Sequence, residues 1–375
     1  MVDLVFLSWF ILIPYLLFGI GAIYGFMKQT QNAALAPIPD HSLTNVTVII
    51  PCRNESEVIS RLLTQLKAHR NTLPGLQVLV IDDHSEDQTL EIISAFHDFQ
   101  SFTLPDDKSG KKAAITFGVE KSSHDIILCL DADVNLPKDF SFQKISAFFQ
   151  EKSDVHLLVF PIKIIPKNRF FGLIHLLEHF ALSTYLISFS SMGFPFLAHG
   201  ACMAFRREKF IQVDGFEGNL EISSGDDTFL LEKIKKLNQN AVSAATDLFA
   251  PVETNSVSTF KQFLAQRIRW ASKFNKGERG LNFCLAIIIG LTNIWMLFST
   301  ILVFINVVPL KTYFIQLGIK FLIDFLLLIL SANYFRQKRY LTGFPIFYWF
   351  YPLLAVWIIF AVFFVPVKWK GRKIK

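Results

Sequence analysis

Four long apolar runs constrain this 375-residue chain more than any other feature of its sequence. Residues 5–26 carry no charged side chain, and about 20 apolar residues are enough for a helix to cross a bilayer. A cleaved signal peptide is the alternative reading, but no basic residue precedes the run. Further apolar runs cover residues 281–308, 312–335 and 344–366. We therefore expect an integral membrane protein.

The chain between the first two runs has a different composition. About 250 residues of mixed character lie there, and they hold nearly all the acidic residues. This length is typical of one soluble domain. Only 18% of all side chains are charged, against roughly 25% in soluble proteins, which again favours a membrane protein. The expected parts are a transmembrane anchor, a soluble domain, a transmembrane or re-entrant bundle and a basic tail, over residues 1–27, 45–280, 281–366 and 367–375.

Basic residues next to the apolar runs predict the side of the membrane on which each part lies. No Lys or Arg precedes the first run and Lys28 follows it, so we expect the soluble domain in the cytosol. Basic residues also follow the third run, at 336–339, and the fourth, after residue 367. Four true spans would put these two clusters on opposite sides. Because a glycine and several prolines interrupt residues 341–366, we expect a re-entrant or interfacial segment there instead.

The net charge and the cysteines indicate which binding partners and which redox compartment to expect. The net charge of +6 indicates contact of the basic clusters with anionic membrane lipids. Nucleic acid is not an expected partner, because the soluble part has no basic stripe. The cysteines form no C-x-x-C pair, so we expect reduced, structural thiols. They are scattered along the chain: Cys52, Cys129, Cys202 and Cys284.

The soluble part alternates between strand and helix patterns. Short β-branched runs at 46–50 and 76–81 flank a segment at 57–70 with helical spacing of its apolar residues. Two strands and a helix within about 35 residues predict parallel strands joined by a right-handed crossover. The alternation continues with expected helices over 89–99 and 111–122 and a buried strand over 125–130. We therefore expect a doubly wound, mostly parallel α/β sheet, which binds ligands beyond the carboxyl ends of its strands.

Polar residues follow each of the three expected strands. The segments are PCRNE at 51–55, DDHSED at 82–87 and DAD at 131–133. Helix capping explains any one of them, but three at one edge of a sheet indicate a ligand site. Neither G-x-G-x-x-G nor G-x-x-x-x-G-K-[ST] occurs at a strand end, so side chains must do what glycine amides do elsewhere. Asp131 and Asp133 suit a divalent cation that also contacts a diphosphate.

Two later segments add acids and hydrogen-bond donors. Asp226 and Asp227 begin a helix expected over 221–234, where acids can simply complement the helix dipole. A helix expected over 263–274 has a basic face that suits solvent or lipid headgroups, or a diphosphate beside an acceptor ring. Its donors, three to four residues apart, and the neighbouring tryptophan are Gln266, Arg269, Lys273 and Trp270.

Taken in order, DD, DAD, GDD and Q-R-I-R-W between about residues 46 and 280 resemble the membrane-bound family-2 glycosyltransferases with a GT-A fold. That group includes ceramide glucosyltransferases, cellulose synthases and hyaluronan synthases. The resemblance implies inverting transfer of a sugar from a nucleotide-diphospho-sugar, a UDP-sugar, to a membrane lipid or lipid-linked acceptor. It also implies Mn²⁺ or Mg²⁺ as cofactor. The catalytic domain would face the cytosol at a membrane such as the bacterial cytoplasmic membrane.

The resemblance also implies which residues bind the donor. Contacts with the nucleoside are implied for Pro51, Arg53, Glu55 and Asp83. Lys112, in KKAA, lies where a lysine meets the sugar diphosphate. Asp133 is the expected metal ligand, with Asp131 closer to the nucleotide and beside the metal.

Further roles implied by the resemblance concern catalysis. Asp227 matches the catalytic base, and Asp226 stands beside it in place of the commoner Glu. Gln266 and Arg269 are expected near the diphosphate, and Trp270 at the acceptor.

Two positions depart from the family pattern, and two other functions stay open. His84 replaces the usual glycine after DD, and Ala114 stands where a glycine is common after the lysine. A processive polysaccharide synthase is one alternative, although four spans or fewer make a polymer tunnel difficult for a monomer. A catalytically inactive membrane scaffold is the other, but the intact acidic and Q-x-x-R-W motifs argue against it.

One internal segment bears on the acceptor. Residues 169–192 are apolar on most sides and predict an interfacial helix, which favours a lipid acceptor. The H-x-x-E-H pattern at 175–179 resembles a zinc motif, but no third ligand accompanies it. Lys320 and Asp324, four residues apart in an apolar run, are expected to pair with each other.

Overall fold

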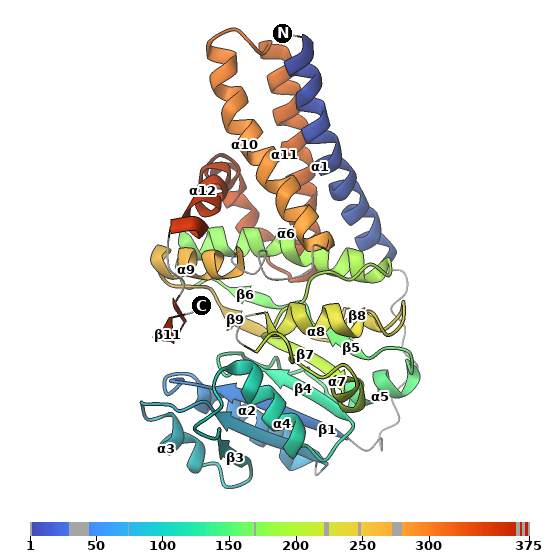
Figure 1. Ribbon diagram of the computed structural model, residues 1–375, viewed down its shortest axis with the longest axis vertical. Helices are drawn as coiled ribbons and strands as arrows, with labels where there is room; N and C mark the ends of the chain where they lie inside the picture. Colours follow the sequence, from blue (N-terminus) through green and yellow to red (C-terminus); the bar gives the residue numbers. More distant parts are fainter. Residues whose placement is uncertain are drawn as a thin grey trace. The chain divides into compact units, whose positions relative to one another are not determined.

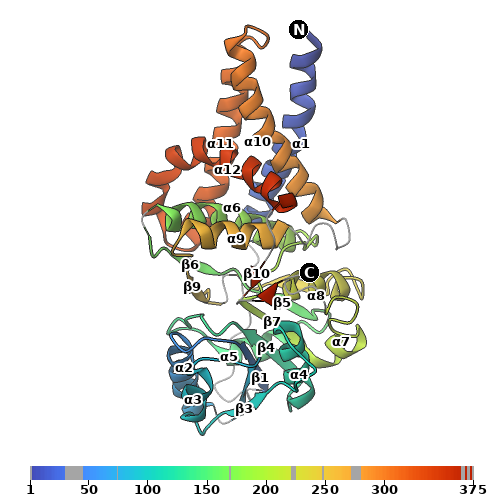
Figure 2. The ribbon, with the colours of Figure 1, turned by 60° about the vertical axis from the view of Figure 1, so that its left-hand side comes forward.

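The computed structural model describes residues 2–29, 45–73, 75–168, 170–220, 225–246, 249–271, 280–364, 368–369 and 372–373. The chain forms two compact units (Figures 1 and 2). The sheet unit comprises Thr30–Ile165, Ser190–Asn255 and Lys368–Lys375, and the helical unit comprises Met1–Gln29, Pro166–Phe189 and Ser256–Val367.

The sheet unit is built on seven strands in the order β3-β2-β1-β4-β7-β5-β8. The first four strands run parallel, and β7 runs antiparallel to its neighbours β4 and β5. The expected strands are β1, β2 and β4, so the predicted mostly parallel sheet is confirmed. The strands are β1 (Val46–Cys52), β2 (Leu76–Asp82), β3 (Gln100–Thr103), β4 (Ile126–Leu130), β5 (Leu157–Val159), β7 (Cys202–Arg206) and β8 (Val242–Ala244).

Helices connect these strands. The helix expected over 89–99 is shorter than predicted, and a strand that was not predicted, β3, follows it. The helices of the sheet unit are α2 (Ile59–Thr72), α3 (Thr89–Ser94), α4 (Lys111–Lys121), α5 (Phe142–Glu151), α7 (Arg207–Gln212) and α8 (Asp226–Ile234). Two small sheets pair β6 (Lys163–Ile165) with β9 (Glu253–Asn255) and β10 (Lys368–Trp369) with β11 (Arg372–Lys373).

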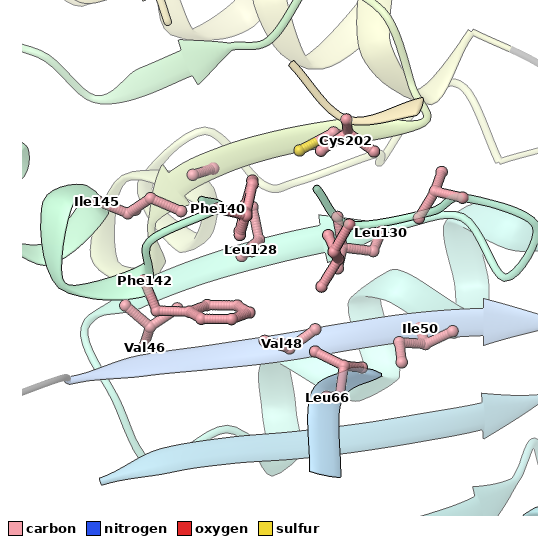
Figure 3. Packing of buried hydrophobic residues seen from close by; sticks show 14 of the residues in the cluster. Val46, Val48, Ile50, Leu66, Leu128, Leu130, Phe140, Phe142, Ile145 and Cys202 are labelled. Atoms are coloured by element: carbon pink, nitrogen blue, oxygen red, sulfur yellow. The ribbon is translucent and has the colours of Figure 1, made fainter. Parts of the chain in front are cut away.

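Alternate residues of the strands face opposite sides of the sheet, which places the core. Val48 and Ile50 of β1 belong to the apolar cluster that includes Leu66 of α2 and Ile145 of α5 (Figure 3). Ile49 points the other way, toward α4. A Cβ built on Gly118 of α4 would lie 2.7 Å from the Ile49 side chain. Helices therefore cover both faces, and the carboxyl edge of the sheet is left for a site.

The helical unit contains the apolar runs. Four of its helices are long and apolar enough to cross a membrane, judged by length and composition, over Ser8–Gln29, Leu281–Phe304, Leu310–Tyr334 and Lys338–Val362. Helices α1, α10 and α11 run side by side, whereas α6, α9 and α12 cross their direction (Figures 1 and 2). The re-entrant or interfacial character of the last apolar run stays a prediction. The elements are α1 (Val2–Gln29), α6 (Phe171–Ser191), α9 (Phe260–Ala271), α10 (Leu281–Phe304), α11 (Leu310–Tyr334), the 3-10 helix η2 (Lys338–Gly343) and α12 (Phe344–Phe364).

Helix α6 belongs to this unit, and most of its residues are buried. The interfacial position expected for residues 169–192 stays a prediction. Helix α6 falls within the soluble domain expected over 45–280, as does α9, yet both pack with the apolar helices. Its H-x-x-E-H side chains are buried and have separate protein partners. His175 Nδ1 accepts from the Val257 amide at 3.3 Å, and His179 Nε2 lies 3.1 Å from Ser183 Oγ.

Candidate functional site

Strand direction brings the polar segments to one edge of the sheet. Strands β1, β2 and β4 are parallel, so their last residues lie at the same edge. Strand β7 runs the other way, and its first residue, Cys202, lies opposite the last residue of β4, Leu130. The residues just before β7 therefore lie beside those just after β4. The Asp131 amide donates to the Ala201 carbonyl oxygen at 3.0 Å.

One ammonium group connects the acids of this edge. Lys111 Nζ lies 2.7 Å from Asp131 Oδ1 and 2.7 Å from Asp226 Oδ2. It also donates to the Gly200 carbonyl oxygen at 2.8 Å. The three charged residues come from the start of α4, the end of β4 and the start of α8. We call Lys111, Asp131 and Asp226 the acid cluster.

Gly200 allows these elements to approach closely. A Cβ built on it would lie 2.9 Å from Asp226 Oδ2 and 3.1 Å from Lys111 Nζ, closer than side chains normally approach. Its amide donates to Asp227 Oδ2 at 3.1 Å, and Asp227 Oδ1 accepts from the Thr228 amide at 2.7 Å. The two adjacent acids thus have different neighbours: Asp226 meets Lys111, and Asp227 meets the backbone at Gly200.

The charges of the acid cluster do not balance. One ammonium faces two carboxylates, and the exposed Asp133 follows two residues after Asp131. Burial raises the pKa of Asp131, and the charges of Asp133 and Asp226 raise it further, while the Lys111 ammonium opposes them. Burial lowers the pKa of Lys111, but the two carboxylates outweigh it and raise that pKa above its usual value. The cluster is therefore negative overall and attracts a further cation.

The loops after β1 and β2 are locked together by Arg53. Its Nη1 donates to the carbonyl oxygens of Asp83 at 2.6 Å and His84 at 2.8 Å, and its Nη2 lies 2.9 Å from Glu86 Oε1. Its side chain is buried, so the guanidinium positions the loop that carries Asp83. The expected nucleoside contacts at Pro51, Arg53, Glu55 and Asp83 thus lie at the ends of two neighbouring strands. Their contact with a nucleoside stays a prediction.

His84 stands where the family pattern has glycine. Its φ is +56°, in the left-handed region that favours glycine. Its ring Nε2 lies 3.1 Å from the Lys108 carbonyl oxygen. The turn therefore keeps the glycine conformation although the residue has changed.

The structure separates the two adjacent lysines of α4. Lys112, the residue expected at the sugar diphosphate, is buried, donates to the Asn219 carbonyl oxygen at 2.7 Å and lies 4.3 Å from the centre of the Phe229 ring. Lys111, which the sequence prediction missed, is the one at the acids. Both lysines follow the glycine of SGKK. The sequence signal that could have identified Lys111 is therefore its place as the first lysine after that glycine.

The Q-R-I-R-W residues lie on α9, in the helical unit. Arg267, between the expected Gln266 and Arg269, forms a buried ion pair with Glu178 of α6. Its guanidinium also lies 4.4 Å from the centre of the Trp270 ring. The acid cluster belongs to the other unit, so the meeting of these motifs in one site stays a prediction. Lys273 lies outside the described residues.

Asp131 and Asp133 were expected to bind a divalent metal. Among the described residues, no group of three or more His, Cys, Asp or Glu side chains is arranged to hold a metal ion. The acid cluster already holds one cationic group, Lys111, between two carboxylates, so its chemistry suits cations. The binding of a metal by Asp131 and Asp133 stays a prediction. Mg²⁺ commonly binds through only one or two carboxylates, with water and substrate phosphate oxygens as its other ligands.

Comparison with known proteins shows which family this part of the chain matches. Residues 47–214 match the family described as glycosyl transferase family 2. A poly-beta-1,6-N-acetyl-D-glucosamine synthase from Staphylococcus aureus (strain COL) is 29% identical over 134 residues, which are 34% of this chain and 32% of that protein. The synthase of that name from Staphylococcus epidermidis (strain RP62A) is 30% identical over 135 residues. The match therefore spans about a third of the length of these curated relatives.

A solved structure extends the likeness to nearly the whole chain. The mannosyltransferase PcManGT from Pyrobaculum calidifontis, in complex with GDP-Man and Mn²⁺, superimposes with a TM-score of 0.50 at 15% identity. The comparison covers 95% of this chain and 99% of that one. At this identity the likeness concerns the fold, and it confirms the expected GT-A architecture.

Proposed function

Because residues 47–214 form a glycosyltransferase family 2 domain, we propose that the chain transfers a sugar from a UDP-sugar to a membrane lipid or lipid-linked acceptor. The acid cluster at the carboxyl edge of the sheet is the observation that carries this proposal. It supplies two carboxylates and an ammonium group where a sheet of this kind receives its ligand. The apolar helices would place the chain in the membrane, where a lipid acceptor is dissolved.

Asp227 is the proposed general base. The acceptor hydroxyl, whose pKa is far above 7, loses its proton to this carboxylate as its oxygen attacks the anomeric carbon. The bond between that carbon and the diphosphate oxygen breaks, and the displacement inverts the anomeric centre. Hydrogen bonds from the amides of Gly200 and Thr228 fix the orientation of the carboxylate. A positioned base typically contributes about 10²–10⁴-fold to the rate.

Lys111, rather than Lys112, is the proposed partner of the diphosphate. Its ammonium group is held at the acid cluster and can neutralise charge that develops on the leaving group. A divalent cation bound by Asp131 and Asp133 would supply further charge neutralisation at the diphosphate. Arg269 is proposed to approach the same diphosphate from α9.

The proposed location follows from the sequence and the helices. The family 2 domain faces the cytosol, where nucleotide sugars are present. The helical unit holds the acceptor with its reactive hydroxyl toward that side. Helix α6, which belongs to this unit, is the element that a lipid acceptor would pass.

Replacement of Asp227 tests the assignment. We expect Asp227→Asn to bind the UDP-sugar as tightly as the wild type, because the amide keeps the shape of the carboxylate. We also expect transfer to fall by about 10²-fold or more, because the amide cannot take a proton. Donor binding is measured by calorimetry and transfer by release of UDP. Turnover near the wild-type rate would contradict the role of Asp227.

A polysaccharide synthase is the second candidate. The staphylococcal relatives carry that name, although the match covers only 32% of their length. A polymer product from the purified chain would favour this candidate. A chain that neither binds nor hydrolyses any of the common sugar nucleotides would instead be an inactive scaffold.

A further inference from the structure

The helical unit contains a cavity that the proposed transfer chemistry does not use. Its volume is about 70 Å³, and helices α1, α6, α10, α11 and α12 line it. About 10–15 Å³ of such space is enough for one water molecule, so the cavity has room for water or for the polar end of a small group. Polar side chains inside apolar helices are costly, and they commonly mark functional sites.

The charged groups of the cavity are already paired. Lys320 Nζ lies 2.6 Å from Asp324 Oδ2, which confirms the pairing expected from the sequence. The Tyr15 hydroxyl donates to the same carboxylate through its other oxygen. Glu178 pairs with Arg267 and also accepts from the Tyr351 hydroxyl at 3.3 Å. Together with Arg267, which pairs with Glu178 but does not line the cavity, these charges sum to zero, which disfavours a ligand with a net charge.

Two further residues of the wall each carry a buried polar atom for which the described part of the chain offers no hydrogen-bond partner. Tyr185 and Asn293 line the cavity, with 2% and 1% of their surfaces exposed. Among the described residues, neither the Tyr185 hydroxyl nor Asn293 Oδ1 has a hydrogen-bond partner. The amide nitrogen of Asn293 is used within α10, where it donates to the Ile289 carbonyl oxygen at 2.8 Å. A buried polar group without a hydrogen-bond partner lowers the stability of the folded protein by about 1–3 kcal/mol.

We propose that this cavity binds the hydroxyl group of an uncharged lipid. Tyr185 offers a donor and Asn293 Oδ1 an acceptor, and a hydroxyl group, which both donates and accepts, matches this pair in chemistry. The balanced charges exclude a phosphate as the favoured head, because it would bring an unpaired charge among paired ones. Ala181, Leu182 and Ile289 add partly exposed apolar surface beside the polar atoms, against which acyl chains can lie. The inference concerns lipid binding and does not depend on the proposed transfer.

Lipid retention by the full-length chain tests the proposal. The chain in detergent is equilibrated with dioleoylglycerol, with its acetylated analogue, which lacks the hydroxyl, or with phosphatidic acid. Retained lipid is counted by native mass spectrometry. We expect the wild type to prefer dioleoylglycerol. Tyr185→Phe removes only the hydroxyl and should weaken retention about three- to tenfold, which is the loss of affinity expected when one hydrogen bond is removed.

Two further variants complete the test. Tyr313→Phe is the matched control, because Tyr313 is a buried tyrosine of α11 that hydrogen-bonds Thr300 away from the cavity, and it should retain the lipid normally. Ala181→Phe fills the cavity and should abolish the preference. Equal retention of dioleoylglycerol and its acetylated analogue, or a preference for phosphatidic acid, would overturn the proposal. So would unchanged retention by Tyr185→Phe, or a cavity that holds only water.

Discussion

Lys111 and Lys112 are neighbours on α4 whose ammonium groups have different surroundings. Consecutive residues of a helix point about 100° apart, so one lysine reaches the acid cluster and the other the Asn219 carbonyl and the Phe229 ring. The sequence motif KK cannot tell which is which, because the answer depends on how α4 packs on the sheet and on α8.

Lys111→Met should destabilise the chain and make it more dependent on a divalent metal. Removing one member of a buried ion pair typically costs about 3–5 kcal/mol, and Asp131, partly exposed, brings the expected cost to the lower end. Mn²⁺ should restore much of the lost thermal stability, because it replaces the missing cation between the carboxylates.

Lys112→Met is the matched comparison for that experiment. It also removes a buried ammonium group, but one whose partners are a carbonyl oxygen and an aromatic ring. Its loss of stability should therefore not be recovered with Mn²⁺. Melting temperatures of both variants with and without the metal provide the measurement. Equal recovery of the two variants would show that Lys111 has no special relation to the acid cluster.

At the scale of elements, the loops after β1 and β2 hold each other in place. Asp87 accepts from the Thr89 amide at 3.0 Å within its own loop and from the Ser56 amide at 3.2 Å in the other. Burial raises the pKa of Asp87, but these hydrogen bonds and those of the Thr89 hydroxyl outweigh it and lower the pKa to about 2. The ionised form is therefore favoured by folding.

Asp87→Asn should lower stability at neutral pH and make little difference in acid. A depressed pKa contributes stability above the unfolded value near 4, and the contribution is lost as the pH falls toward 2. Because Asp87 is exposed, we expect about 1 kcal/mol or less. Melting temperatures at pH 7 and pH 2 measure the effect, with Asp106→Asn as an exposed control. A gap between wild type and Asp87→Asn that is the same at both pH values would contradict this account.

The ion pair between Glu178 and Arg267 joins α6 to α9. Both side chains are buried, so Glu178→Leu should cost about 3–5 kcal/mol by leaving an unpaired guanidinium. The double variant with Arg267→Leu should be less destabilised than the single one, because no charge is then left buried. Thermal unfolding in detergent provides the comparison. Additive losses would mean that the two charges do not interact.

Sequence patterns predicted the elements that carry strong periodicity and missed those that do not. β1, β2 and β4 are apolar runs followed by polar residues. Because the three strands pair in parallel, the polar residues lie at one edge of the sheet. β3 was missed because Gln100–Thr103 is polar and mostly exposed. In the Q-R-I-R-W motif, only packing decides that Arg267 rather than Arg269 faces Glu178.

The whole molecule combines a segment, residues 47–214, that matches glycosyl transferase family 2 with helices apolar enough to span a membrane. The sequence predicted both parts from composition and motif order. The domain expected over 45–280 includes α6, expected as an interfacial helix, and α9, and tertiary packing groups both with the apolar helices. A polar cavity among those helices is invisible in the sequence, because its lining residues come from five helices that are far apart along the chain.

The fate of the transferred sugar tests the central claim most directly. Membranes containing the full-length chain are incubated with radiolabelled UDP-sugars, and the products are separated into an organic phase, a polymer fraction and a water-soluble fraction. We expect radiolabel in the organic phase with the wild type and almost none with Asp227→Asn. Label in the polymer fraction, or equal labelling of lipid by the two proteins, would contradict it.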